Sequence, residues 1–448
     1  MKNSKHLQWL YQELPALMNA GIISAETAEK LRAYYGEIKE GNKSRIALII
    51  FGVLGALLIG SGIILLLAHN WDELSHAVRT VLSLTPLLIG QLLAGWAILR
   101  KRESMAWRES TATFVMLAIG ASISLIGQTY HLSGDFGKFL LTWMLLSLPF
   151  VYLLRATAPA LLYLWGITAW AGVRQSEAEH ALFFWPLAAL VIPYFWQAVK
   201  VNRYSIRAII LAWGISLSLC VATGIVLEGA LPGLWIIVYS GFFAVLFLAG
   251  SSYFGEAPTL WQRPFHTVGA CGIAGLAFIL AYEWPWREIG WKYFRTSPEF
   301  HFNAALFDYV LTMTLFIVTL YFLFRKTCAQ QTATWLFGVM PIVSLIGYLI
   351  VASGANTGLT LALFNLYLFA CGLVVTINGI QAGRLGTVNA GMIILAALIV
   401  ARFFDSELGF VIRGLAFILV GIGFFIVNWI IARKISASPT DKKTTNGF

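Results

Sequence analysis

Long runs of apolar residues without charge recur along the chain, and they limit the fold more than any other feature. The run IALIIFGVLGALLIGSGIILLLAH, residues 46–69, is typical, and similar runs continue to Ile431. Each is close to the roughly 20 residues that an α-helix needs to cross a lipid bilayer. Strands of an outer-membrane barrel would instead alternate polar and apolar residues over about ten positions. The sequence therefore predicts an all-α, polytopic bundle of transmembrane helices.

Charged residues are too few for a water-soluble fold. They make up 12% of the 448 residues, and hydrophobic residues make up 59%, whereas about 25% of the residues in an ordinary soluble domain are charged. Most of the chain is therefore expected to lie in a bilayer. About 14 spans are predicted, at residues 46–68, 80–98, 111–129, 139–155, 157–173, 181–199, 207–227, 232–250, 266–282, 304–324, 334–353, 357–377, 386–402 and 410–432.

The distribution of basic residues predicts which side of the membrane each loop faces. Lys and Arg are retained preferentially in short cytoplasmic loops. With the N-terminus inside and an even number of spans, only eight of the 31 Lys and Arg residues fall on or near the outer side. Both termini are therefore predicted to be cytoplasmic. The net charge of +10 is then a signal of topology, and no nucleic-acid partner is expected.

The segments before the first span and after the last one are polar. Residues 1–45 are predicted to form a cytoplasmic helical hairpin, because HLQWLYQELPALMNAG and SAETAEKLRAYYGEIKEG have helical character and Ser24 is placed to cap the second helix. The alternative is a solvated tail that only helps to set the topology. Residues 433–448 are predicted to be a disordered cytoplasmic tail.

A first group of polar residues follows the third predicted span, in GQTYHLSGDFGK, residues 127–138. Gln128, His131 and Asp135 would share one helical face with Ser124 if the helix continued to Gly134. Polar groups within a bilayer are expensive unless they pair or border water, so this face is a candidate site. The alternative is a helix that ends near Gln128, followed by a surface turn in which Tyr130 anchors the interface.

A second group follows the first span, in HNWDELSHAVRT, residues 69–80. His69, Asp72 or Glu73, and His76 would lie on one helical face and offer two imidazoles and a carboxylate to a divalent metal. No other cofactor is expected. The alternative is an amphipathic interfacial helix with Trp71 among the lipid headgroups.

A third group is ARFFDSELGFVIRG, residues 401–414, which flanks the last predicted outer turn. Arg413 lies about one turn inside a span, where an unpaired guanidinium would be costly. Its expected partner is Asp405, Glu407 or an anionic ligand, and Arg402 lies at the other side of the turn. A structural salt bridge and a ligand site both remain open.

Two of these groups resemble a bacterial "predicted membrane protein" family that is defined by an N-terminal domain of unknown function. That family shows Asn-Trp-Asp at the outer end of its first span, and Gln-x-Tyr-His followed by Gly-Asp after its third. The matching residues here are Asn70, Trp71, Asp72, Gln128, Tyr130, His131, Gly134 and Asp135.

The resemblance covers about residues 1–160, so it divides the membrane part into an N-terminal family region, 46–160, and a C-terminal membrane region, 161–432. It implies a multi-pass protein of the bacterial cytoplasmic (inner) membrane. It also implies a small membrane protein with a Gly-Asp-Tyr motif as a partner, in addition to membrane lipids. It implies no particular activity.

The function predicted from these features is that of a transporter or flippase-like carrier with an outer-facing polar cavity. The expected substrate-binding residues are Gln128, Tyr130, His131, Asp135, Asn70, Trp71, Asp72, Arg402, Asp405 and Arg413. One alternative is a membrane-embedded enzyme that acts on a lipid or lipid-linked glycan, with His131 or Asp135 as acid or base. Another is a membrane scaffold or sensor. The chain lacks GxxxxGK[ST], so it shows no ATP-binding motif of its own.

Overall fold

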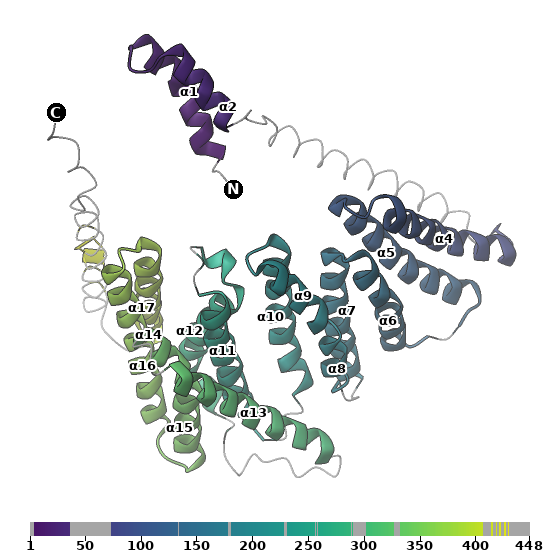
Figure 1. Cartoon of the computed structure of the whole chain (residues 1–448). Coiled ribbons are helices and arrows are strands. Elements are labelled where there is room, and N and C mark those ends of the chain that lie inside the picture. The colour runs from purple at the N-terminus through teal and green to yellow at the C-terminus, as the bar shows by residue number, and fades with distance from the viewer. Residues whose placement is uncertain are drawn as a thin grey trace. The chain divides into compact units, whose positions relative to one another are not determined.

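The computed structural model describes residues 4–35, most of 73–405, and scattered positions between 414 and 429. The gaps within 73–405 are residues 133, 178–180, 228–230, 256, 258, 288, 290–301 and 327–331. All regular structure in the described part is helical (Figure 1). The predicted all-α, polytopic class is confirmed. The chain divides into an N-terminal unit, Met1–Arg79, and a C-terminal unit, Thr80–Phe448.

The N-terminal unit contains a helical hairpin of α1 (Ser4–Asn19) and α2 (Ala25–Tyr35). Ser24 caps α2 as predicted, because its Oγ accepts a hydrogen bond from the N–H of Thr27 at 3.2 Å. The hydroxyl of Tyr11 in α1 donates to the carbonyl of Arg32 in α2 at 3.4 Å. Leu14 is fully buried. The expected hairpin is thus present, and its cytoplasmic location stays a prediction.

The described helices of the C-terminal unit are α4 (His76–Arg100, whose first turn belongs to the N-terminal unit), α5 (Met105–Thr129), α6 (Phe136–Leu154), α7 (Thr157–Ser176), α8 (Phe184–Ala189), α9 (Ile192–Asn202), α10 (Ile206–Val226), α11 (Leu234–Tyr253), η2 (Leu260–Gln262), α12 (Pro264–Leu280), η3 (Trp284–Trp286), α13 (Phe302–Lys326), α14 (Thr332–Gly338), α15 (Met340–Ala352), α16 (Thr357–Gln381) and α17 (Leu385–Asp405). Helices of this unit that follow one another in the chain often pack together, as α6 and α7, α11 and α12, and α16 and α17 do (Figure 1).

Ten described helices, counting α8–α9 and α14–α15 as one each, are long and apolar enough to cross a membrane. The predicted spans 157–173 and 266–282 correspond to α7 and α12, which are not among these ten. Helix α12 has only 17 residues. The predicted spans 46–68 and 410–432 lie wholly or largely outside the described residues. The total of about 14 spans therefore stays a prediction.

The C-terminal unit is built around two main hydrophobic cores. The first joins α5 to α10 and includes Met144, Tyr163 and Phe184. The second joins helices α11 to α17 around Trp286 and Phe364. Aromatic contacts connect helices of the two groups: the rings of Trp213 in α10 and Trp261 in η2 stack with centroids 5.4 Å apart, and the Trp213 indole N–H donates to the carbonyl of Trp261.

Helices α11 and α12 approach each other so closely that glycine is required on both sides. A Cβ atom at Gly250 in α11 would lie 2.2 Å from the backbone nitrogen of His266. A Cβ atom at Gly269 in α12 would lie 2.4 Å from the backbone nitrogen of Phe247. Close backbone packing through small residues is typical of membrane helices, because lipid supplies no hydrophobic force that drives helices together.

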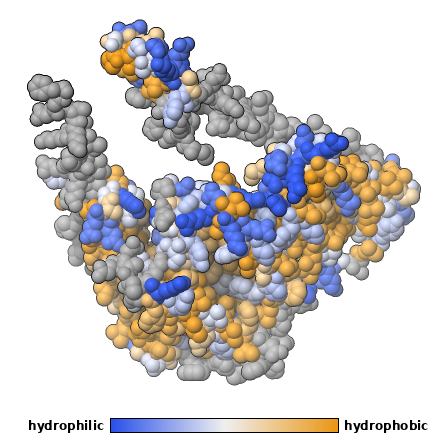
Figure 2. All heavy atoms as spheres, in the orientation of Figure 1, coloured by the Kyte–Doolittle hydropathy of each residue, from blue (hydrophilic) through white to orange (hydrophobic). Residues whose placement is uncertain are grey.

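Large apolar side chains also cover outward-facing parts of the helices. Leu99, Val201 and Phe324 are 81%, 88% and 72% exposed. On the visible face of the C-terminal unit, hydrophobic residues cover much of the helix surface and hydrophilic residues gather toward one edge (Figure 2). Continuous apolar surface of this kind is unfavourable in water and suited to acyl chains.

Two candidate spans are broken by proline. In the span Phe184–Asn202, Pro193 has no N–H and helix α8 ends before α9 begins. The carbonyl of Leu187 at the end of α8 accepts a hydrogen bond from the hydroxyl of the fully buried Tyr163 in α7, at 3.1 Å. The hydroxyl of Tyr152 in α6 donates to the carbonyl of Leu190 in the break itself.

The second break has the same construction. In the span Thr332–Ala352, α14 ends at Gly338 and Pro341 is the second residue of α15. The carbonyl of Leu336 accepts a hydrogen bond from the hydroxyl of Tyr367 in α16, at 2.9 Å. Pro86 and Pro149, by contrast, lie inside the continuous helices α4 and α6. Proline therefore breaks only some of the spans, and at both breaks a buried tyrosine supplies a donor to the backbone.

Candidate functional site

The turn between α5 and α6 contains four of the predicted site residues. Helix α5 ends at Thr129, and the N–H of Leu132 donates back to the carbonyl of Gly127 at 2.9 Å. His131 has a left-handed backbone with φ of 48°, which a right-handed helix cannot continue through. The predicted helical face that continues beyond Gln128 is therefore wrong. The alternative, a turn that follows a helix ending near Gln128, is the conformation present.

Asp135 closes this turn by capping α6. Its Oδ1 accepts hydrogen bonds from the N–H of Gly137 at 2.7 Å and from the N–H of Lys138 at 3.4 Å. Its Oδ2 lies 3.7 Å from the Nζ of Lys138 and 3.4 Å from Nη1 of Arg174, which is in the last turn of α7. Asp135 therefore joins the start of α6 to the end of α7.

The other three residues of the turn are at the surface. Gln128, Tyr130 and His131 are exposed. The hydroxyl of Tyr130 lies 2.9 Å from the hydroxyl of Thr80 in α4, and Nδ1 of His131 lies 2.9 Å from the carbonyl oxygen of Gln128. The turn thus gathers the four residues locally.

Arg402 lies in the last turn of α17, in a different polar cluster. Its Nε donates to Oδ1 of Asn365 in α16 at 2.8 Å, and its Nη2 donates to the carbonyl of Ala281 at the end of α12. Its guanidinium lies 5.5 Å from the ring centroid of Tyr282. Arg402 thereby links the ends of α12 and α17 to α16. Asp405 is the last residue of α17.

The remaining predicted site residues are mostly outside the described part of the chain. His69, Asn70, Trp71, Asp72 and Arg413 lie there. His76 is the first residue of α4 and is exposed. Within the described residues, no group of three His, Cys, Asp or Glu side chains is placed to hold a metal ion. The predicted metal site, two of whose three ligands are not described, stays a prediction.

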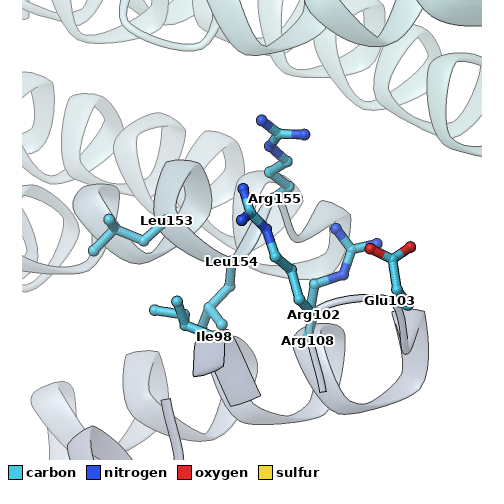
Figure 3. Close-up of a pocket in the computed structure, with 7 residues that line it drawn as sticks. All are labelled: Ile98, Arg102, Glu103, Arg108, Leu153, Leu154 and Arg155. Carbon is cyan, nitrogen blue, oxygen red and sulfur yellow. The ribbon is translucent and has the colours of Figure 1, made fainter. Parts of the chain in front are cut away.

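A pocket of about 370 Å³ lies at the other end of α5. It is lined by Ile98, Arg102, Glu103, Arg108, Leu153, Leu154 and Arg155. Figure 3 shows the aliphatic side chains on one side and the charged ones on the other. Helix α5 has 25 residues, so about 37 Å of helix separates this pocket from the predicted turn at 130–135. None of the predicted binding residues lines it.

A polar network at the same end joins the starts of α5, α7 and α10. Oε1 and Oε2 of Glu109 lie 2.7 and 2.8 Å from the N–H of Thr157, and Oε2 accepts from the N–H of Ala158 at 2.9 Å. Arg207 donates from Nε to Oγ1 of Thr157 at 3.2 Å and from Nη2 to the hydroxyl of Tyr194 at 2.6 Å. We call this end, with the turns 101–104, 155–156 and 203–205, the basic end.

From the sequence, only positive charge is predicted in these turns, and Glu109 is not identified as a residue that binds the start of another helix. One signal was present: Glu109 is a carboxylate at the edge of a span within a basic segment. An isolated charge there requires a partner when its helix is buried.

Comparison with known proteins bears on the part of the molecule that holds the turn and the pocket. Residues 15–160 match the family described as Predicted membrane protein (DUF2157). We refer to residues 15–160, which are similar to this family, as the DUF2157 region. No curated protein and no solved structure matches the chain significantly. Together with the ten apolar helices, the DUF2157 match shows a multi-pass integral membrane protein.

The DUF2157 region runs from α1 to the beginning of α7. It agrees with the stretch on which the resemblance was based, about residues 1–160. It contains both the turn at 130–135 and the pocket-lining residues 98–155. Arg402 and the two broken spans lie outside it.

We expect the stability supplied by Asp135 in the DUF2157 region to depend on pH. Partial burial raises the pKa of Asp135, but the N–H groups of Gly137 and Lys138 and the cations of Lys138 and Arg174 outweigh that effect and hold it below the ordinary value of 3.8. A carboxyl with a lowered pKa stabilises the folded state above its unfolded pKa, and this stability is lost as the pH falls through the folded pKa.

Asp135→Asn keeps a capping side chain but removes the charge. In detergent at pH 7 the variant should therefore melt at a lower temperature than the wild type, and the difference should shrink as the pH is lowered below 3.8. Melting followed by circular dichroism from pH 7 to pH 3 measures this. Asp135→Ala, which removes the cap as well, should stay less stable than Asp135→Asn throughout. A constant gap between wild type and Asp135→Asn over the whole range would contradict the assignment.

Proposed function

We propose that the protein is a flippase-like carrier of the bacterial cytoplasmic membrane that moves a lipid-type substrate between leaflets. The observation that supports a carrier is the pair of broken spans, Phe184–Asn202 and Thr332–Ala352. Carriers are often built with discontinuous membrane helices, whose interrupted backbone is tolerated only where protein or an aqueous cavity satisfies its polar groups. Here a tyrosine hydroxyl of a neighbouring helix donates a hydrogen bond to a backbone carbonyl beside each break.

A break of this type permits two arrangements of one span. A continuous helix holds every carbonyl in a hydrogen bond along its axis, so bending it requires those bonds to be lost. At the breaks, Leu187 and Leu336 also accept from Tyr163 and Tyr367, which belong to neighbouring helices, and Leu187 still accepts from the N–H of Leu190 at 3.2 Å. The tyrosines therefore keep these two carbonyls hydrogen-bonded when the half-helices change their mutual angle.

The substrate-contacting residues proposed for this carrier remain those of the predicted outer face. Gln128, Tyr130 and His131 stand at the surface of the turn, and Arg174 adds a cation beside Asp135. Asn70, Trp71, Asp72, Arg402, Asp405 and Arg413 complete the proposed set. A hydrolytic role is less well supported, because Asp135 caps a helix with a lowered pKa and a general acid needs a raised one.

The experiment uses the purified full-length protein in liposomes that contain a fluorescent NBD-labelled phospholipid. Dithionite bleaches only label in the outer leaflet, so bleaching beyond the outer-leaflet fraction reports movement of lipid between leaflets. We expect the wild type to show this movement. The double variant Pro193→Ala/Pro341→Ala should slow it several-fold, because alanine lets both broken spans become continuous helices.

The matched control is Pro86→Ala/Pro149→Ala, which changes two prolines inside continuous helices and should leave the rate unchanged. Two outcomes would contradict the proposal. One is bleaching no greater than in protein-free liposomes. The other is an equal rate for the wild type and the variant with both breaks removed.

A further inference from the structure

The pocket at the basic end is formed by the ends of three helices. Ile98 comes from the last turn of α4, Arg102 and Glu103 from the turn that follows, and Arg108 from the first turn of α5. Leu153, Leu154 and Arg155 come from the end of α6. The chain therefore brings three arginines together from segments about 50 residues apart in sequence.

The pocket has more positive than negative charge. Its lining contains three arginines and the single carboxylate of Glu103, beside the aliphatic side chains (Figure 3). Nε of Arg108 is buried and has no hydrogen-bond partner within the described residues. A buried donor without a partner is costly. Guanidinium groups match the geometry of phosphate oxygens with two parallel hydrogen bonds, so a phosphate is the ligand that would satisfy this donor.

Arg155 is held at a backbone position that ordinarily selects glycine. It follows the last residue of α6 with φ of 48° and ψ of 49°, the left-handed conformation common just after helices. In the described residues, His131 and Arg155 are the only non-glycine residues with positive φ. A side chain kept at a strained position points to a role for that side chain. Here it contributes the third guanidinium of the pocket.

The pocket also adjoins the apolar surface of the helices. Leu153 is 62% exposed and lines the pocket, and the adjacent Leu99 and Met105 are 81% and 53% exposed. Charge and exposed aliphatic surface meet here within a few residues. A free inorganic anion would use only the charged side, whereas a phospholipid would use both.

We propose that this pocket binds the phosphate group of an anionic phospholipid, with Arg102, Arg108 and Arg155 around the phosphate and acyl carbons along Ile98 and Leu153. The lipid comes from the leaflet at the basic end, which the distribution of Lys and Arg predicts to be cytoplasmic. The site goes beyond carrier function, because a lipid bound there need not be the one that is moved.

The test measures which phospholipids remain bound to the purified full-length protein. The protein is equilibrated with detergent micelles that contain equal amounts of phosphatidylglycerol and phosphatidylcholine, and the bound lipids are counted by native mass spectrometry. The wild type should retain phosphatidylglycerol in preference by several-fold, because both lipids carry the phosphate but the three arginines repel the choline cation of phosphatidylcholine. The variant Arg102→Gln/Arg108→Gln/Arg155→Gly should retain the two lipids equally.

The matched control is Arg100→Gln/Lys200→Gln/Arg384→Gln, which removes the same charge from exposed positions outside the pocket and should keep the wild-type preference. Arg155→Gly alone fits the left-handed backbone, so it tests the site in a protein expected to fold. It should weaken the preference without a fall in melting temperature.

Inorganic phosphate separates the two sources of the ligand group. If phosphate alone displaces phosphatidylglycerol from the wild type at equal concentration, the site is one for a free anion and the lipid assignment is overturned. An unchanged preference in the pocket variants, or an equal loss in the control variant, would also overturn it. None of these results bears on the NBD-lipid assay, which measures movement between leaflets and follows the broken spans.

Discussion

Replacing Gly269 by isoleucine is expected to lower the free energy of unfolding by about 3 kcal/mol, at the upper end of what overpacking usually costs. The Cβ atom would lie 2.4 Å from the backbone nitrogen of Phe247 and 2.7 Å from the carbonyl oxygen of Phe243. Backbone atoms cannot rotate away as a flexible side chain can, so α11 and α12 must separate. Gly250 on the facing helix offers no relief, because it already lies against the backbone of His266.

The control for this prediction lies on the same helix. Gly275 in α12 has open space around its would-be Cβ atom, so Gly275→Ile changes the same residue type without a clash. Its free energy of unfolding should lie within about 0.5 kcal/mol of the wild-type value. Unfolding in mixed micelles of mild detergent and SDS, followed by circular dichroism, compares the two variants. Equal stability of Gly269→Ile and Gly275→Ile would show that α11 and α12 are not in backbone contact.

Replacing Glu109 by alanine is expected to cost about 3 kcal/mol as well, through loss of charge-assisted hydrogen bonds and two unsatisfied donors. A helix start leaves about four N–H groups without partners inside the helix. At α7, Ala156 donates to the carbonyl of Val151 at 3.2 Å, and Thr157 and Ala158 donate to Glu109. Pro159 has no N–H. One carboxylate on another helix therefore replaces the side-chain cap that Ala156 cannot provide.

Glu109→Gln retains one carbonyl acceptor and should lose about half as much stability as Glu109→Ala. Glu26→Ala is the control, because Glu26 pairs with Lys30 at 2.7 Å on an exposed helix face, where an ion pair contributes about 0.5 kcal/mol or less. The same SDS titration ranks the three variants. Equal free energies of unfolding for Glu109→Ala and Glu26→Ala would refute the capping role of Glu109.

The spans were predictable because each depends on the composition of one continuous segment. Helices α4, α10 and α16 begin and end within about four residues of the predicted spans. The cap at Ser24 was predictable for the same reason, since Ser24 and Thr27 lie three residues apart. Helix breaks were only partly predictable, because Pro86 and Pro193 look alike in sequence and differ in the packing around them.

The candidate sites depend on contacts that sequence spacing does not contain. Helical spacing left open a shared face beyond Gln128 or a turn, and the left-handed backbone of His131 ends the helix before such a face can form. The sequence placed Arg402 only at the side of an outer turn, whereas its hydrogen bonds reach Asn365 and Ala281. The partners of Glu109 are 48 and 49 residues away. Each of these contacts depends on how two helices are placed in space, and the sequence of one segment does not contain that information.

The stacked indoles of Trp213 and Trp261 form an intrinsic spectroscopic probe of the packing between two helix groups. Their centroids are 5.4 Å apart, and one ring belongs to α10 while the other precedes α12. Transition dipoles at this separation couple strongly, so a shift of one helix group against the other changes the near-ultraviolet dichroism without any attached dye. Near-ultraviolet circular dichroism of the unlabelled protein should therefore detect a movement of α10 relative to α12.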